Sequence, residues 1–292
     1  MNSTTILVIA TIMVCAIPWV VAVLLVSRAG SAFCDTSVPA GDTRTAKDTL
    51  TLTVLFDNYA HDERLKTGWG FSCLVTGLEK TILFDTGDNG TILLSNMGTL
   101  GIEPTDVDIV VLSHEHHDHV GGLEAFLEKN HAVKVFVPAS FSEGFKRRVR
   151  AEGATVVEVS KPCPICQGAQ SSGQLGTGIE EQALCVNTAN GLFVITGCAH
   201  PGIVEIVRVA STLDKAGVYG AMGGFHMGGF PEGKIAEVID LLKAMGVSVA
   251  GPCHCSGDLT RKMMRQAFNK GYLTIGVGSI VELQAPAHLS GE

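Results

Sequence analysis

The chain has 292 residues, of which 46% are hydrophobic and 17% are charged. This length and composition are sufficient for one large hydrophobic core or two modest ones. Its 21 basic and 29 acidic side chains give a formal net charge of −8, which argues against a general nucleic-acid binder. Small acidic substrates remain possible, because a bound metal can supply positive charge locally.

Residues 1–27 are predicted to be a transmembrane anchor or a signal segment. Within them, residues 6–26 (ILVIATIMVCAIPWVVAVLLV) carry no charge and are long enough to cross about 30 Å of hydrocarbon as a helix. No basic residue precedes this run, and it is longer than the usual core of a signal peptide, which favours an uncleaved single-pass anchor. The small residues of AGSAFC at 29–34 leave the alternative of cleavage near residue 32 followed by export.

The residues that follow the apolar run bear on its orientation. Arg28, Arg44 and Lys47 all come after it, so the positive-inside bias predicts that the C-terminal domain is cytoplasmic. The nine cysteines are an odd number without the spacing of a disulfide scaffold, which is consistent with a reducing compartment. Residues 28–48 are small, polar and aperiodic and are predicted to be a linker. The globular domain is therefore expected over residues 49–292.

From residue 49 onward, short β-branched runs alternate with helical patterns. Strands are expected at residues 50–57, 71–76, 81–85, 107–113, 133–138, 154–159, 183–188, 192–197, 217–224, 247–252 and 273–278. Helices are expected at residues 121–129, 144–152, 203–213, 235–245 and 258–268. Strands that alternate with helices predict an α/β fold in which helices cover sheets and functional residues gather in loops at strand ends.

The motif SHEHHDH at residues 113–119 lies between an expected strand and an expected helix. In an extended turn, alternate side chains share a side, so His114 and His116 should converge on one point. Asp118 and His119 follow the bend and can address a second point. The alternative is a histidine-rich surface turn without a ligand.

Two more histidines end expected strands, His200 in VITGCAHPG and His254 in AGPCHCSG. Together with the histidine turn they offer imidazole nitrogens and a carboxylate. This donor set suits zinc, and also iron or manganese. A metal site is therefore predicted.

These motifs resemble the metallo-β-lactamase superfamily, in which HxHxDH follows a strand and isolated histidines end later strands. The resemblance covers residues 49–278. Several segments are similar to one branch of the superfamily, the 7,8-dihydropterin-6-methyl-4-(β-D-ribofuranosyl)aminobenzene-5'-phosphate synthases. They are VLFDNYA (54–60), GFSCLVTG (70–77), ILFDTG (82–87), EEQALCV (180–186), GLFVITGCAHPGI (191–203), GGFHMGG (223–229) and PCHCSG (252–257).

The resemblance implies a four-layer αββα sandwich with two divalent metal ions at one edge of the sheets. By position, one ion would be held by His114, His116 and His200. The other would be held by Asp118, His119 and His254. Zinc is favoured, with iron or manganese as alternatives.

The implied activity is that of a metal-dependent hydrolase or transferase. A metal-activated water or a metal-bound phosphate would act on a phosphorylated or pyrophosphorylated small metabolite, such as a pterin. Asp118 would also orient the water or move its proton, and Asp85 in FDTG would support the histidine turn as a hydrogen-bond acceptor. A surface aspartate is the alternative for Asp85. Two other functional classes remain open, a diiron redox enzyme on the same fold and a non-catalytic membrane-tethered metal or ligand sensor.

The chain departs from the superfamily where an aspartate usually bridges the two metals. His226 in VYGAMGGFHMGG stands there, and a neutral imidazole has a single lone pair with which to bind. His226 is therefore predicted to contact substrate or to act as an acid, with ligation of one metal and a structural role as the alternatives. Asp57, Asn58 and Glu181 are further candidates for substrate binding, although an Asp-Asn pair also forms turns and Glu181 could belong to a polar strand.

Overall fold

The computed structural model describes residues 48–289. The predicted anchor at residues 1–27 and the predicted linker up to residue 47 lie outside these residues. Within the described part of the chain, no helix is both long and apolar enough to span a membrane. The described residues belong to one compact unit, and its first strand begins at Thr49.

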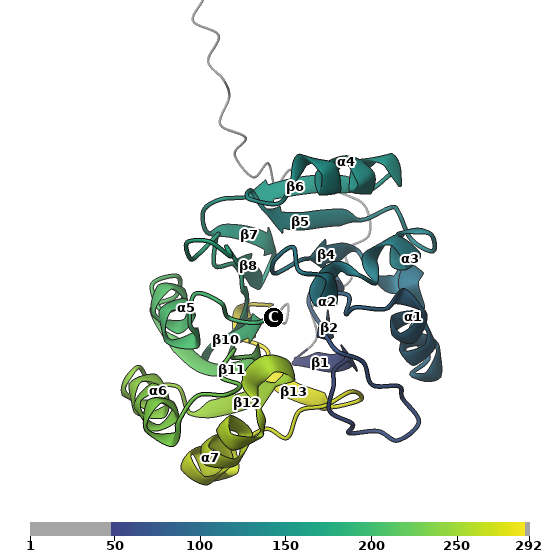
Figure 1. Cartoon of the computed structure of the whole chain (residues 1–292). Coiled ribbons are helices and arrows are strands. Elements are labelled where there is room, and N and C mark those ends of the chain that lie inside the picture. The colour runs from purple at the N-terminus through teal and green to yellow at the C-terminus, as the bar shows by residue number, and fades with distance from the viewer. Residues whose placement is uncertain (1–47, 290–292) are drawn as a thin grey trace, which may run out of the picture. The chain divides into compact units, whose positions relative to one another are not determined.

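Two mixed sheets form the centre of the domain (Figure 1). The first has seven strands in the order β13-β1-β2-β3-β4-β5-β6. They are β1 (Thr49–Phe56), β2 (Ser72–Thr76), β3 (Ile82–Phe84), β4 (Ile109–Val111), β5 (Lys134–Pro138), β6 (Thr155–Val159) and β13 (Ile280–Gln284). Strands β3 to β6 run parallel to one another, so their carboxyl ends lie at one edge of this sheet.

The second sheet has six strands in the order β12-β11-β10-β9-β8-β7. They are β7 (Cys163–Cys166), β8 (Ala169–Ser171), β9 (Leu184–Thr188), β10 (Gly191–Thr196), β11 (Val218–Gly224) and β12 (Val249–Cys253). Strands β10, β11 and β12 are parallel. The loops that leave their carboxyl ends therefore lie side by side, and these loops carry three of the predicted site histidines.

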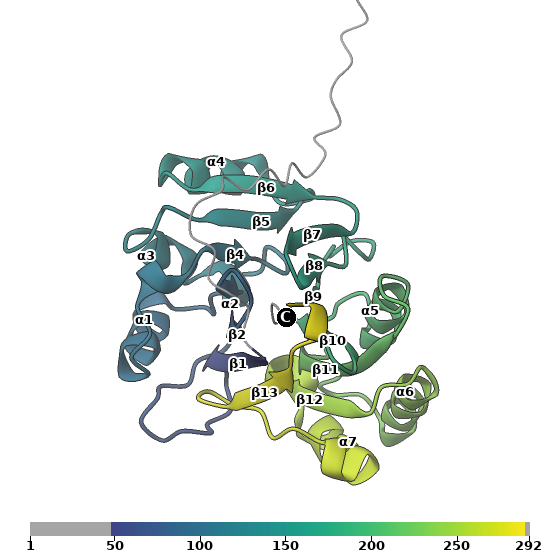
Figure 2. The same ribbon diagram turned by 180° about the vertical axis from the view of Figure 1, so that it is seen from behind.

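Helices cover the outer face of each sheet (Figures 1 and 2). The first sheet is covered by α1 (Gly90–Thr99), α3 (Leu123–Leu127) and α4 (Glu143–Ala151). The second is covered by α5 (Ile203–Ala210), α6 (Glu232–Ala244) and α7 (Asp258–Phe268). The resulting order of layers is helices, sheet, sheet, helices. The prediction of an α/β sandwich is confirmed.

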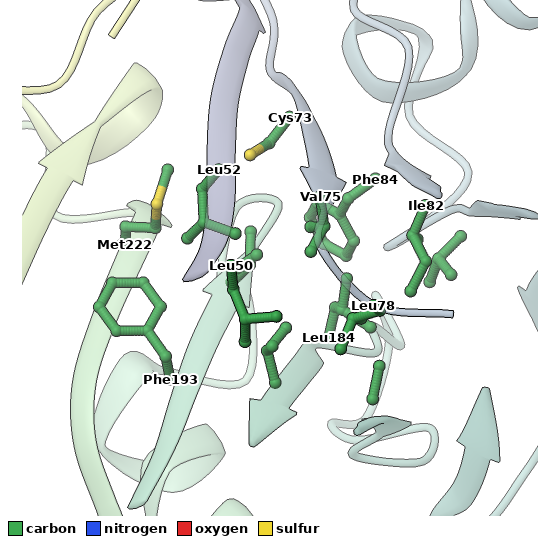
Figure 3. Close-up of a cluster of buried hydrophobic side chains, with 14 of the residues drawn as sticks. Leu50, Leu52, Cys73, Val75, Leu78, Ile82, Phe84, Leu184, Phe193 and Met222 are labelled. Carbon is green, nitrogen blue, oxygen red and sulfur yellow. The ribbon is translucent and has the colours of Figure 1, made fainter. Parts of the chain in front are cut away.

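The inner faces of the two sheets share one apolar core (Figure 3). Leu50 and Leu52 of the first sheet are fully buried in one cluster with Phe193 and Met222 of the second. Burial of one such side chain contributes roughly 1.5–3 kcal/mol. The two sheets are thus fixed against each other, and so are the loops at their common edge.

The structure differs from the predicted elements at one expected strand and at several elements that were not predicted. The expected strand at 273–278 is irregular, with isolated bridges at Tyr272 and Val277, and the regular strand is β13, which pairs with β1. Strands β7 and β8 and helix α1 were not predicted. Helix α1 is poor in strong helix formers, yet Asn89 caps it by accepting a hydrogen bond from the Ile92 amide, and Leu93 and Met97 bury its inner face.

Candidate metal centre

The six predicted ligands come from three loops at the common edge of the two sheets. The histidine turn leaves β4 and enters the short helix α2 (His117–Val120), whereas His200 follows β10 and His254 follows β12. The structure brings their donor atoms into two groups, each with members within 4.8 Å of one another. One group is His114, His116 and His200, and the other is Asp118, His119 and His254 together with Cys198.

Side chains alternate along the extended part of the turn, so the candidate ligands point to one side and the residue between them points to the other. The rings of His114 and His116 lie 4.6 Å apart, centroid to centroid. Glu115 between them points away, and its carboxylate accepts hydrogen bonds from the amide and hydroxyl of Ser142. Ser142 in turn caps helix α4. The period of two predicted from the sequence therefore describes this turn correctly.

Three of the histidines are oriented by a hydrogen-bond acceptor at Nδ1. His119 Nδ1 lies 2.7 Å from Asp85 Oδ2, His200 Nδ1 lies 3.0 Å from Glu181 Oε2, and His254 Nδ1 lies 3.1 Å from Asn58 Oδ1. An acceptor at Nδ1 holds the ring proton on that atom. The Nε2 lone pair is then free to face a cation, which is the usual arrangement around metal-binding histidines.

His114 is oriented through a relay that also ends at Asp85. The Ser113 hydroxyl donates to Asp85 Oδ2 at 2.7 Å and lies 2.9 Å from His114 Nδ1. Nδ1–H therefore donates to the serine oxygen, and Nε2 carries the lone pair. That Nε2 atom is buried without any hydrogen-bond partner, and burial lowers the pKa of His114 to about 2. A buried, neutral imidazole with an unpartnered lone pair fits a metal ligand.

Asp118 is the anionic member of the second group. Its Oδ2 lies 3.3 Å from His254 Nε2 and 3.5 Å from His119 Nε2. Burial opposes charge on His119, but the carboxylates of Asp85 and Asp118 outweigh it and raise the pKa of His119 to about 10. A cation bound at Nε2 would replace the additional proton that these two carboxylates favour.

Backbone strain is concentrated at this edge. Among the described residues, five that are not glycine have positive φ, and four of them are Asp85, Ala199, His226 and His254. Such conformations cost about 1–3 kcal/mol each and persist where the surrounding structure enforces them. Their clustering marks this edge as the functional part of the fold.

His226 lies at the rim of the site. It follows β11, its side chain is exposed, and its ring centroid is 4.5 Å from that of His200. One of its ring nitrogens lies within 4.8 Å of donor atoms of Cys198 and His200, but His226 belongs to no group that contains Asp118. Contact with substrate and ligation of a single metal both fit this position.

Two of the predicted substrate-binding residues lie beneath the site instead of lining it. Glu181 is fully buried, and its carboxylate accepts hydrogen bonds from the amides of Cys198, Ala199 and His200. Asp57 is also fully buried, and it accepts a hydrogen bond from the Tyr59 amide. Both carboxylates are shielded from solvent by the protein, which favours a supporting role over the direct contact with substrate that was expected.

The third of these residues, Asn58, supports a candidate ligand. Its amide oxygen faces His254 Nδ1 at 3.1 Å, and its amide nitrogen donates to the His254 carbonyl at 3.4 Å. Asp85 accepts hydrogen bonds from the amide and hydroxyl of Ser113 and lies beside His119 Nδ1, the position expected of a supporting acceptor. The sequence could not distinguish these roles, because each depends on the distant loop that the side chain meets.

Two residues at the site were not predicted. Cys198 Sγ lies 3.2 Å from His119 Nε2, and only its place in the sequence GCAH, two residues before His200, hinted at this. Trp69 lies on the loop between β1 and β2 with 55% of its surface exposed, and its ring centroid is 5.0 Å from that of His254. A lone exposed tryptophan gave no signal in the sequence.

Comparisons with known proteins show what this chain is similar to. Residues 70–197 match the family model of the metallo-beta-lactamase superfamily. The chain is 26% identical over 287 residues to the 7,8-dihydropterin-6-methyl-4-(beta-D-ribofuranosyl)-aminobenzene-5'-phosphate synthase of Methanocaldococcus jannaschii, which covers 80% of this chain and 97% of that protein. The resemblance inferred from the motifs is confirmed.

Solved structures share the fold. A metal-dependent hydrolase of the beta-lactamase superfamily superimposes with a TM-score of 0.68 at 26% identity, covering 80% of this chain and 99% of that one. A diphosphatase from the PhnP family superimposes with a TM-score of 0.56 at 14% identity, covering 82% of this chain and 98% of that one. The diphosphatase shows the fold alone. The family model, the named synthase and the metal-dependent hydrolase together confirm the prediction that the chain is an enzyme.

Proposed function

We propose that this chain, an enzyme that carries a metallo-β-lactamase domain, is a metal-dependent hydrolase or transferase that acts on a phosphorylated or pyrophosphorylated small metabolite. The metal ligands are His114, His116 and His200 for one divalent ion. The second divalent ion is held by Asp118, His119 and His254.

One observation carries the proposal. The Nε2 atom of His114 is buried and has no hydrogen-bond partner, and His114 belongs to the group in which one donor atom each of His114, His116 and His200 lie within 4.8 Å of one another. A buried polar atom without a partner costs about 1–3 kcal/mol. A cation at this point would remove that cost.

Each residue has a distinct part in the chemistry. Two bound divalent ions would supply Lewis-acid activation of a water or a phosphate oxygen. Asp118, held between His119 and His254 and partly open to solvent, can orient a nucleophilic water and accept its proton at a carboxylate oxygen. His226, exposed at the rim beside His200, can contact the substrate or donate a proton to the leaving group.

The name of the similar synthase from Methanocaldococcus jannaschii includes a 5'-phosphate. This supports a phosphorylated substrate for the present chain. Phosphate oxygens are hard anionic groups that pair well with divalent ions. The net charge of −8 does not oppose this, because the ions supply the local positive charge.

We also propose that residues 6–26 anchor the enzyme in a membrane with the catalytic domain on the cytoplasmic side. The support is the uncharged apolar run and the position of the basic residues after it. Export after cleavage near residue 32 is the alternative outcome of the test given in the Discussion.

The test of the function is metal analysis of the purified full chain, followed by a substrate panel of phosphodiesters, diphosphates, lactones and reduced pterin phosphates. The expected result is one to two equivalents of zinc, iron or manganese and turnover of a phosphorylated member of the panel. His114→Ala should lose metal. His117→Ala is the matched control, because this histidine of the same motif is exposed and belongs to neither donor group. A chain that binds no metal, or in which both variants behave alike, would refute the proposal.

A further inference from the structure

Cys198 lies between the two donor groups, and we propose that its thiolate is a metal ligand that links them, in the role that an aspartate usually has in this superfamily. The inference rests on the proposed function, because it concerns the same pair of divalent ions. It adds a seventh ligand to the six predicted from the sequence.

The position of the sulfur singles out this residue. Cys198 Sγ lies within 4.8 Å of the donor atoms of Asp118, His119 and His254, and it also forms a group with His200 and His226. Among the described residues, no other side chain is grouped both with Asp118 and with His200. A sulfur at this point can face a cation on either side, since a thiolate has more than one lone pair.

A further anion among the ligands would help to balance the charge of two divalent ions. Of the six predicted ligands only Asp118 is anionic, so two divalent ions would leave a large uncompensated charge at a partly buried edge. The usual bridging aspartate is replaced by His226, which brings no negative charge. A thiolate at Cys198 restores the second negative charge, and coordination deprotonates a thiol outright, with the proton leaving to solvent.

The backbone holds Cys198 as firmly as it holds the proposed ligand His200. The Cys198 amide donates to Glu181 Oε1 at 2.9 Å, and the same carboxylate binds the amide and ring of His200. Ala199 between them has a φ of 61°, a conformation that costs energy for a residue with a Cβ. One buried carboxylate thus fixes Cys198 and His200 as a unit, as is usual for metal ligands.

The contacts of the sulfur distinguish Cys198 from an ordinary buried cysteine. A structural cysteine packs among apolar groups, as Cys185 does in a cluster of aliphatic side chains. Cys198 is 3% exposed, yet its sulfur meets an imidazole nitrogen at 3.2 Å. The unpartnered, buried Nε2 of His114 in the adjoining group independently indicates a cation at this edge.

The identity of the ligand also bears on the identity of the metal. Thiolate sulfur is a soft donor that prefers zinc or iron, whereas manganese and magnesium prefer oxygen donors. We therefore expect zinc to outcompete manganese at this site. Replacement of the sulfur by oxygen in Cys198→Ser should reduce the ratio of zinc affinity to manganese affinity.

The experiment uses the full chain in detergent, stripped of metal with a chelator and reloaded with Co²⁺. A cobalt–thiolate bond produces a sulfur-to-cobalt charge-transfer band in the near ultraviolet, which histidine and carboxylate ligands do not. The band should appear in the wild type and be absent in Cys198→Ser. The zinc affinity of Cys198→Ser should also fall by at least about tenfold, because loss of even a contact that supports a ligand costs about 10–100-fold. Cys198→Asp should lack the band but keep its metal content, because it restores an anionic donor.

Cys255→Ser is the matched control. Its sulfur is the nearest other thiol, 3.6 Å from the Cys198 carbonyl, but it belongs to no donor group. This variant should keep the band. The inference is overturned if cobalt binds to the wild type without the band, or if the band survives in Cys198→Ser or disappears in Cys255→Ser. A wild type that binds no cobalt refutes the proposed function as well, so the two failures are distinguishable.

Discussion

Asp85 Oδ2 lies 2.7 Å from Nδ1 of His119, and both side chains are completely buried. The carboxylate fixes the imidazole so that Nε2 faces Asp118 and Cys198. It also accepts the hydroxyl of Ser113 and so orients His114 through the same oxygen. One aspartate beneath the site therefore positions a histidine of each donor group.

Asp85→Asn should weaken metal binding at both positions. An amide keeps the size of the carboxylate but can present a donor to Ser113 and His119, so both imidazoles lose the proton arrangement that exposes Nε2. Loss of such a supporting contact costs about 10–100-fold in metal affinity, measurable by competition with a chromophoric chelator. Asp106→Asn, on an exposed helical turn, should leave the affinity unchanged; equal affinities in all three proteins would contradict the role assigned to Asp85.

Glu181→Gln should change how stability depends on pH. Burial opposes the charge of Glu181, but hydrogen bonds from His200 and from backbone amides outweigh burial and lower its pKa to about 2 from an ordinary value of 4.5. The carboxylate therefore stabilises the fold above pH 4.5, and this contribution, on the order of 3 kcal/mol, is lost as the pH falls from about 4.5 to about 2.

Denaturant unfolding of the metal-free protein at pH 7 and at pH 3 measures this effect. The wild type should lose more unfolding free energy between the two pH values than Glu181→Gln does. At pH 7 the variant should be the less stable protein, because the glutamine cannot accept hydrogen bonds at both ends. Parallel losses in the two proteins would show that Glu181 has no linked protonation.

His226→Ala should separate substrate chemistry from ligation. If His226 contacts substrate or acts as an acid, the metal content of His226→Ala should stay near the wild-type value. Its turnover should fall by a factor on the order of 10²–10⁴. His226→Asp should bind the second metal more tightly, because it introduces the carboxylate that usually bridges the two metals. It should still lose native activity, because the imidazole is gone. Loss of metal in His226→Ala would identify His226 as a ligand, and full activity in both variants would remove it from the site.

Trp69 should report metal occupancy by its fluorescence. Its ring lies 5.0 Å from that of His254, so an open-shell ion such as Co²⁺ bound to that histidine would quench the indole emission. The chain has two tryptophans, Trp19 and Trp69. Addition of Co²⁺ to the stripped protein should lower the emission, and chelator should restore it. In Trp69→Phe the response should vanish; a response that persists there would place the bound ion elsewhere.

The full-length chain should remain with membranes after washing with high salt or carbonate. The uncharged segment at residues 6–26 would be held by the hydrophobic effect, which such washing does not weaken. Fractionation followed by immunoblotting measures the distribution. Recovery of a soluble protein that starts near residue 32 would instead establish cleavage and export.

The sequence determined the parts of this protein that depend on local order. Alternation along the histidine turn placed His114 and His116 together and turned Glu115 away, because side chains of an extended segment alternate sides whatever the rest of the chain does. Ten of the eleven expected strands and all five expected helices correspond to observed elements, because their apolar periodicity reflects burial on one face. The exception, residues 273–278, is apolar because it is buried against the loop after β1, not because it pairs in a sheet.

The tertiary structure decided which side chains support the site and which face it. Asp57 and Glu181 end or precede strands as site residues do, yet both are buried, and only the packing of the two sheets brings Glu181 beneath the loop that carries His200. Cys198 and Trp69 became part of the site in the same way. Hydrogen-bond partners far apart in the chain meet through the packing of strands and helices, and no local pattern of residues encodes those contacts.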